Sequence, residues 1–246
     1  MIPKTILVAT GVASLVASNS AFAQPVTFAA DDTGKSVSVD YNGFREGRPI
    51  EGLGSSATFT LTGVEDGFHF ETPARFFNFD YSIANTSSIP SELSSFAFRT
   101  NPSGSNYVIG FVSGAFEGFE GASTYSDGIG SVDACFANFG DPASCENRDA
   151  GIFPGEVGFG TFRLAFYDAI SFLTFDDFFV RYDSVEGAGD VASASGQGLV
   201  TSVSSGGDPV QVPEPGTLTI FALGVGALIA RRRGSSPLRH LAPKPA

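Results

Sequence analysis

Short segments in which apolar and polar residues alternate run through the middle of the chain and limit its fold more than any other feature. Alternation with a period of two places one face of a β-strand in a core and the other in water. The alternating segments are 36–41, 57–64, 76–83, 96–98, 107–111, 158–166 and 175–182. Two of them put rows of large apolar residues on one face: Phe77, Phe79, Tyr81 and Ile83, and Phe162, Leu164 and Phe166. The chain is therefore predicted to be mainly β, with these rows in its core.

Pairs of turn-forming residues separate the alternating segments: Asn42-Gly43, Asp66-Gly67, Asn101-Pro102, Asp127-Gly128 and Pro154-Gly155. The 30 Gly and 25 Phe, with no Trp, also fit a turn-rich extended chain. Short strands with such punctuation are typical of an antiparallel β-sandwich or jelly roll. A parallel α/β fold is disfavoured because no amphipathic helix of the usual length lies between the segments.

Two tracts lack the alternation. Residues 114–154 are rich in Gly, Asp and Asn, and a loop of that length is usually functional or mobile. Residues 187–209 are small and polar and are predicted to be a flexible spacer, with one last strand around 199–203. The predicted β domain therefore covers residues 24–203, and residues 204–212 form a Ser/Gly spacer.

The N-terminus has the three parts of a secretory signal peptide. Lys4 supplies a positive charge, residues 5–16 are apolar, and Ala21 and Ala23 are the small residues that a signal peptidase accepts. Cleavage after residue 23 would leave Gln24 first. The alternative, a buried N-terminal helix, lacks an amphipathic period. Residues 1–23 are therefore predicted to be a signal peptide.

The region between the termini is strongly acidic. From Gln24 to Val212 there are 25 acidic and 8 basic residues, a net charge of −17. Such a surface repels nucleic acid and anionic headgroups, so no nucleic-acid partner is predicted. Solubility accounts for the acidity, and weak Ca²⁺ binding is the alternative. Asp127, Ser131 and Asp133 offer oxygen ligands for Ca²⁺, but their spacing does not fit an EF-hand.

The chain has only two cysteines, Cys135 and Cys145. An exported chain matures in an oxidising compartment, and the intervening Gly140-Asp141-Pro142 lets the chain turn back. A local disulfide is predicted, worth about 2 to 3 kcal/mol. A zinc site is disfavoured because no His lies nearby and tetrahedral zinc needs four N or S ligands.

No residue is predicted to be catalytic or to hold a metal or cofactor. His69 lies between Phe68 and Phe70, and on a period of two it should face solvent, opposite to both rings. A serine triad is disfavoured because no G-x-S-x-G elbow is present. The adjacent acids Asp31-Asp32 and Asp176-Asp177 would point to opposite faces of a strand and form no glycosidase pair. The chain is predicted not to be an enzyme.

The C-terminal part carries three elements in a fixed order. They are the motif Pro213, Glu214 and Pro215, the uncharged run 216–230, and the basic stop Arg231, Arg232 and Arg233. The prolines hold the motif extended and accessible. As a helix the uncharged run would rise about 22 Å, less than the roughly 30 Å hydrocarbon core, so bilayer thinning or arginine snorkelling must make up the difference. The arginines should stay cytoplasmic. Residues 213–233 are predicted to be a single transmembrane anchor, and 234–246 a basic tail.

This order of elements resembles the PEP-CTERM sorting signal of Gram-negative and related bacteria. Proteins with that signal are thought to be substrates of an exosortase, a membrane transpeptidase-like cysteine enzyme, in organisms that make exopolysaccharide and biofilm matrix. The resemblance implies processing at residues 213–215 after export and signal-peptidase cleavage. The tail from residue 234 departs from the pattern, since family members often end at the arginines. An ordinary membrane anchor that no exosortase recognises is the alternative.

Residues 55–64, 76–87 and 132–145 resemble, more weakly, the exported domain of the cistern family of PEP-CTERM proteins, whose molecular role is undefined. The resemblances imply a structural or adhesive protein that is held first at the inner membrane, with its body on the periplasmic side. It then reaches the cell surface or extracellular matrix, where exopolysaccharide is the expected partner. The alternative is a secreted carbohydrate-binding or glycoside-hydrolysing protein with a jelly-roll fold.

Overall fold

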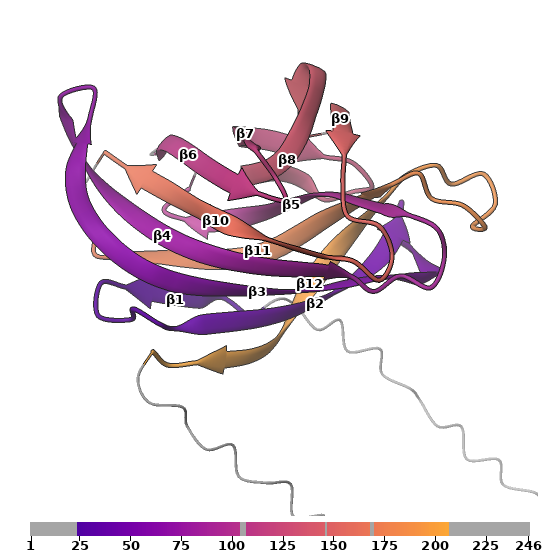
Figure 1. Cartoon of the computed structure of the whole chain (residues 1–246), viewed down its shortest axis with the longest axis horizontal. Helices are drawn as coiled ribbons and strands as arrows, with labels where there is room; N and C mark the ends of the chain where they lie inside the picture. Colours follow the sequence, from indigo (N-terminus) through magenta and orange to yellow (C-terminus); the bar gives the residue numbers. More distant parts are fainter. Residues whose placement is uncertain (1–23, 104–106, 146, 168–169, 207–246) are drawn as a thin grey trace, which may run out of the picture. The chain divides into compact units, whose positions relative to one another are not determined.

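The computed structural model describes residues 24–103, 107–145, 147–167 and 170–206, which we call the body (Figure 1). The predicted signal peptide, the sorting motif, the apolar run, the arginines and the basic tail lie outside the described residues. No helix among the described residues is long and apolar enough to cross a membrane.

The body is built from strands that pair antiparallel throughout, and its described residues contain no helix. The strands are β1 (Val26–Ala29), β2 (Ser36–Arg45), β3 (Arg48–His69), β4 (Thr72–Asn85), β5 (Glu92–Asn101), β6 (Tyr107–Gly114), β7 (Gly118–Tyr125), β8 (Gly130–Ser144), β9 (Asn147–Ala150), β10 (Val157–Phe166), β11 (Phe172–Asp183) and β12 (Ala194–Ser204). The predicted mainly antiparallel β fold is confirmed.

One hydrogen-bonded sheet contains all of these strands, in the order β6-β10-β4-β3-β2-β12-β11-β5-β8-β7. β1 pairs with β11 and β9 with β8 beside this path. The sheet bends so that the half from β6 to β2 packs against the half from β11 to β8 (Figure 1). The two layers of the predicted sandwich are therefore present, and β12 joins them into one continuous sheet.

Phenylalanine rings fill the space between the two layers. The ring of Phe59 on β3 lies 5.1 Å from that of Phe98 on β5, and Phe162 on β10 lies 4.8 Å from Phe136 on β8. Each fully buried Phe contributes about 1.5 to 3 kcal/mol, and edge contacts between rings add to this. Both rows predicted from the alternation are buried here: Phe77, Phe79, Tyr81, Ile83, Phe162, Leu164 and Phe166.

All seven alternating segments lie within strands, but two of the predicted turns are wrong. Asn42-Gly43 lies inside β2 at a register shift, and Asp66-Gly67 lies inside β3. The β3–β4 hairpin continues to Phe70-Glu71 because Arg75 of β4 holds Asp66 of β3 at 2.7 Å across the pair. The other predicted turn pairs lie at a turn or at a strand end: Asn101-Pro102, Asp127-Gly128 and Pro154-Gly155.

The tract 114–154, predicted to be a long loop, contains β7, β8 and β9 instead. The main chain of β8 pairs with β5 on one side and β7 on the other, through residues such as Ala134 and Ala137. Ladder hydrogen bonds need no large side chain, so small residues in this tract conceal strands from a pattern based on hydrophobicity.

The last strand predicted around 199–203 is present, but it begins earlier than predicted, at residue 194 in the tract expected to be a flexible spacer. Residues 194–204 form β12, which pairs with β11 and β2 in the middle of the sheet. A side chain at Gly196 would collide with Val180, and one at Gly198 would collide with Val39 and Phe178. The small residues are therefore required by close packing.

Candidate functional site

The residues predicted to direct sorting lie outside the described residues. They are Pro213, Glu214, Pro215, Arg231, Arg232 and Arg233, together with Ala21 and Ala23 at the signal-peptide cleavage point. Gln24, the residue predicted to begin the mature chain, is exposed just before β1. The first strand, β1, begins two residues later at Val26.

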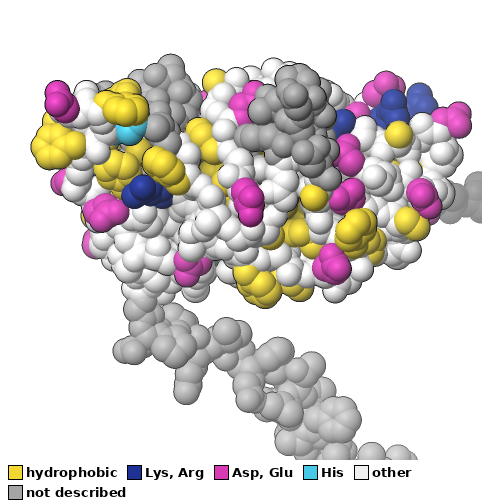
Figure 2. All heavy atoms as spheres, turned by 45° about the horizontal axis from the view of Figure 1, so that its top comes forward, with side chains coloured by type: hydrophobic (Ala, Val, Ile, Leu, Met, Phe, Trp, Pro, Cys, Tyr) yellow, Lys and Arg dark blue, Asp and Glu magenta, His cyan; other side chains and the backbone are white. Residues whose placement is uncertain are grey.

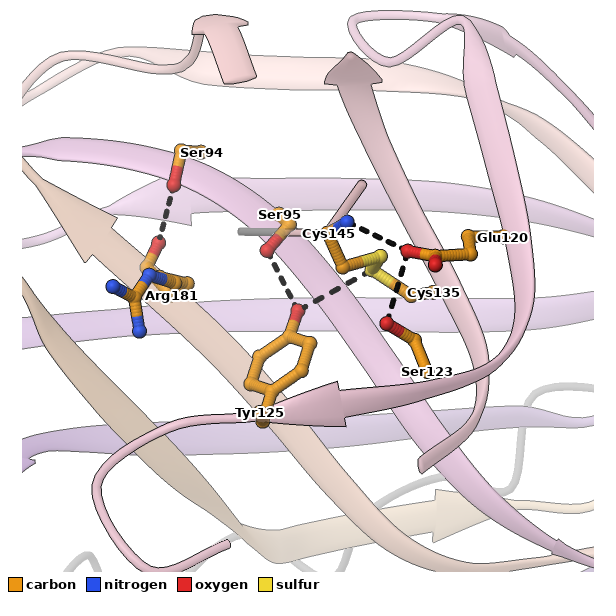
Figure 3. The surroundings of a disulfide bond; sticks show 8 residues. All are labelled: Ser94, Ser95, Glu120, Ser123, Tyr125, Cys135, Cys145 and Arg181. Carbon is orange, nitrogen blue, oxygen red and sulfur yellow. Dashed lines mark hydrogen bonds between the residues drawn. A yellow bond between two sulfur atoms is a disulfide. The ribbon is translucent and has the colours of Figure 1, made fainter. Parts of the chain in front are cut away.

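The structure contains the predicted disulfide between Cys135 and Cys145 (Figure 3). Cys135 lies within β8 and Cys145 directly follows it, with 6.3 Å between their Cα atoms. Both residues are fully buried. Bonded, buried sulfurs offer no thiolate, so this pair supports structure rather than nucleophilic chemistry.

A network of hydrogen bonds holds the disulfide in place (Figure 3). The Tyr125 hydroxyl lies 2.6 Å from the Ser95 hydroxyl and 3.6 Å from Cys135 Sγ. Glu120 Oε2 accepts the backbone N–H of Cys145 at 2.6 Å and the Ser123 hydroxyl at 2.9 Å. These bonds tie β5, β7 and β8 together around the sulfurs.

Arg181 of β11 is a buried cation that sequence reasoning missed. It lies 3.8 Å from Asp127 and 3.4 Å from Asp183, and it donates to the Ser193 hydroxyl at 2.9 Å. Its backbone carbonyl accepts the Ser94 hydroxyl at 3.3 Å (Figure 3). A buried charge must be paired, so these contacts fix the β11–β12 connection.

The residues considered for Ca²⁺ make bonds within the protein. Asp127 accepts the Ser195 hydroxyl at 2.9 Å, and Asp133 accepts the Thr100 backbone N–H at 2.8 Å. The backbone carbonyl of Ser131 accepts Arg99 at 2.9 Å. Within the described residues, no group of three or more His, Cys, Asp or Glu is placed to hold a metal ion. Weak Ca²⁺ binding stays a prediction.

The acids of β11 interact with each other and with one arginine. Burial raises the pKa of Asp176, and the nearby charges of Asp177 and Asp133 raise it further. Asp177 itself pairs with Arg99 at 3.1 Å. Arg99 also lies over the ring of Phe179, 4.9 Å from its centroid, so its guanidinium covers that ring.

Arg163 on the outer face of β10 lies between two aromatic rings. Its guanidinium carbon is 5.1 Å from the centroid of Phe76 and 4.4 Å from that of Phe111. The shallow groove beside it has a volume of about 400 Å³ and contains one carboxylate, that of Asp80. A glycosidase needs two convergent carboxyl groups, so this groove does not have the required geometry.

The end of the β3–β4 hairpin differs from the prediction for His69. Phe68 is 73% exposed and Phe70 is 85% exposed, whereas His69 is partly buried. The imidazole packs 4.2 Å from the Phe70 ring, and its Nδ1 lies 3.4 Å from the Tyr167 hydroxyl. The hairpin extends past the rest of the sheet (Figure 1), which leaves the rings of Phe68 and Phe70 exposed.

The hairpin turn holds two residues in an unfavourable backbone conformation. Phe70 has φ 45° and Glu71 has φ 66°. Two-residue hairpin turns with both φ values positive favour Asn-Gly, because a side chain in the left-handed region is strained. The turn therefore presents a large apolar ring to solvent from a conformation that Phe rarely adopts.

Further exposed aromatic residues lie at the same end of the sheet. Tyr167 follows β10, whose last residue Phe166 pairs with Arg75, and it is 44% exposed. Phe172 begins β11 and is 51% exposed. Figure 2 shows apolar side chains gathered around the histidine of the hairpin. We call Phe68, Phe70, Tyr167 and Phe172 the aromatic end.

A model of the PEP-CTERM protein-sorting motif matches residues 211–233. The chain carries a PEP-CTERM sorting motif. This motif is recognised by an exosortase, and it implies export, processing at a membrane and delivery to the surface. The chain has no match among curated proteins or solved structures. Its likeness to the cistern family remains a prediction.

Proposed function

We propose that this PEP-CTERM protein is a structural or adhesive component of the cell surface or extracellular matrix and has no catalytic role. The sorting motif at residues 211–233 is the observation that carries the proposal. The body supports it, because a buried disulfide and an aromatic core suit a chain that must persist outside the cell.

The proposed path has two stages. The chain is first held in the inner membrane by residues 216–230, with the arginines cytoplasmic and the body periplasmic. An exosortase then cuts near Pro213-Glu214-Pro215 and releases the body to the surface. Exopolysaccharide is the proposed neighbour there. The acidic surface, with a net charge of −17 from residue 24 to 212, favours a neutral polymer over an anionic one.

Replacing Pro213, Glu214 and Pro215 with alanines tests the assignment. The substitution should abolish C-terminal processing and leave export intact, because the motif is the part of the chain that the exosortase is proposed to bind. Intact mass spectrometry of the mature protein shows where the chain has been cut at its N-terminus and at its C-terminus. Alanines at Asp208, Pro209 and Val210 are the matched control and should leave the mature mass as in the wild type, apart from the substitutions. Normal processing of the motif variant would show that residues 213–215 do not direct the cut, and a wild-type chain that keeps its C-terminal segment would be a plain anchor.

A further inference from the structure

The aromatic end lies at the end of the sheet from which the chain leaves the body. Ser204, the last residue of β12, is in register with Ser36 of β2, which in turn is opposite Thr60 of β3. β12 and β3 run in the same direction, because each pairs antiparallel with β2. β3 then continues from Thr60 to His69. The hairpin therefore projects beyond the point where β12 ends.

The part of β3 beyond Thr60 and the segment 207–215 have similar maximum lengths. At about 3.3 Å per residue, β3 extends some 30 Å past the level of Ser204. The residues from 207 to 215 separate the body from the apolar run, and fully extended they span at most about 30 Å. A bilayer that holds residues 216–230 is thus within reach of the hairpin turn.

The charges near the turn are mixed, because an arginine neutralises one of the acids. Asp66 is bound at two points by Arg75, at 2.7 and 3.0 Å, which lowers the pKa of its carboxyl. Glu65 and Glu71 add negative charge beside the rings. This pattern suits zwitterionic headgroups and disfavours strongly anionic ones.

A second copy of the body is the weaker occupant for the same surface. The net charge of −17 from residue 24 to 212 repels a like-charged partner. A lipid interface, in contrast, favours aromatic rings at the headgroup level, where one side of a ring contacts acyl chains. Exposed Phe side chains at a projecting turn have this arrangement.

We propose that the β3–β4 hairpin turn, through Phe68 and Phe70, inserts into the headgroup region of the bilayer that holds the C-terminal segment. The proposal rests on the membrane-held stage of the proposed function. Two contacts, the anchor and the hairpin, then fix the orientation of the body on the membrane. Cutting near Pro213-Glu214-Pro215 leaves only the hairpin contact, and two exposed rings hold a soluble domain weakly. Release follows from processing.

Because the chain has no Trp, the fluorescence of a single introduced Trp reports on one position alone. The full chain is reconstituted into phosphatidylcholine vesicles as the single-Trp variants Phe70→Trp and Phe68→Trp. Phe159→Trp is the matched control, because Phe159 is 65% exposed and lies near the start of β10, at the opposite end of the sheet. Emission wavelength and quenching by acyl-brominated lipids are measured, and flotation shows which fraction of the chain is bound.

The expected result is emission shifted to shorter wavelength, with strong quenching, at positions 70 and 68 and neither effect at 159. Vesicles rich in phosphatidylglycerol should weaken the quenching. If the chain floats and position 70 is quenched no more than 159, the insertion is refuted while the anchor stands. If the chain does not float, the membrane-held stage fails and the insertion fails with it. A blue shift without vesicles that grows with protein concentration would assign the surface to a second copy.

Discussion

At the residue scale, the turn of the β3–β4 hairpin combines strain with exposure. Positive φ at Phe70 and Glu71 costs of order 1 kcal/mol per residue, and neither side chain gains burial in return. Strain that the fold does not need is commonly retained where a surface acts on a partner. The turn is therefore the position in the body at which stability and the proposed membrane contact should oppose each other.

The double substitution Phe70→Asn with Glu71→Gly should stabilise the protein. Asn-Gly suits a turn with two positive φ values, so the free energy of unfolding should rise by about 1 kcal/mol. Urea denaturation measures the change. Glu46→Asn in the β2–β3 turn is the control, with a smaller gain because Gly47 already occupies the second position. A loss of stability in the double variant would show that the ring contact between Phe70 and His69 outweighs the strain.

Sequence alternation predicted the buried residues well where a strand has one solvent-exposed face and one buried face. Phe77 and Phe162 followed this rule. It failed for His69 and its two neighbours, because alternation assumes that one face is covered, and both neighbouring rings are exposed at the hairpin end. It also could not find the interior polar contacts. Tyr182 is buried, and this burial raises its pKa. Its hydroxyl shares a 2.8 Å hydrogen bond with Ser55, a residue 127 positions away in the sequence.

At the element scale, the disulfide joins the interior of β8 to the residue just past its end. Without it, the buried end of this strand depends on the hydrogen bond from the Cys145 backbone to Glu120 and on the contact of Cys135 with Tyr125. Cys135→Ala with Cys145→Ala should therefore lower the free energy of unfolding by about 2 to 3 kcal/mol. Chemical denaturation measures it.

Reduction provides the control for the cysteine variant. Wild-type protein in excess dithiothreitol should unfold at the same denaturant concentration as the double alanine variant, and the variant itself should not respond to the reductant. Equal midpoints for oxidised wild type and variant would mean that the hydrogen bonds and packing alone hold this region.

Strands with small residues mark the limit of sequence prediction at this scale. β7, β8 and β12 were missed wholly or in part, because Gly, Ala and Ser carry little of the apolar signal that defines a pattern. Their pairing comes from main-chain ladders and from close approach, as at Gly196 and Gly198. Such packing depends on neighbours that are distant in the sequence, so no local window contains it.

At the scale of the whole body, β12 decides whether two layers become one sheet. It pairs with β2 over Ser36–Phe44 and with β11 over Phe179–Tyr182, so it joins the part of the sheet from β6 to β2 to the part from β11 to β7. The sequence predicted two packed layers from strand number and turn spacing, but it predicted only residues 199–203 of this closing strand and not which strands it joins. The order of strands requires long-range pairing that periodicity does not encode.

Truncation tests this role of β12. A chain of residues 24–193 should lose cooperative unfolding, because β2 and β11 both lose a partner and the core beside Tyr182 opens to water. A chain of residues 24–206 is the matched control and should unfold in one cooperative transition with the circular dichroism of a β protein. Thermal and urea melts of the two chains give the comparison. Equal cooperativity in both would show that β12 is an accessory strand and that the two layers are held together by their phenylalanine core alone.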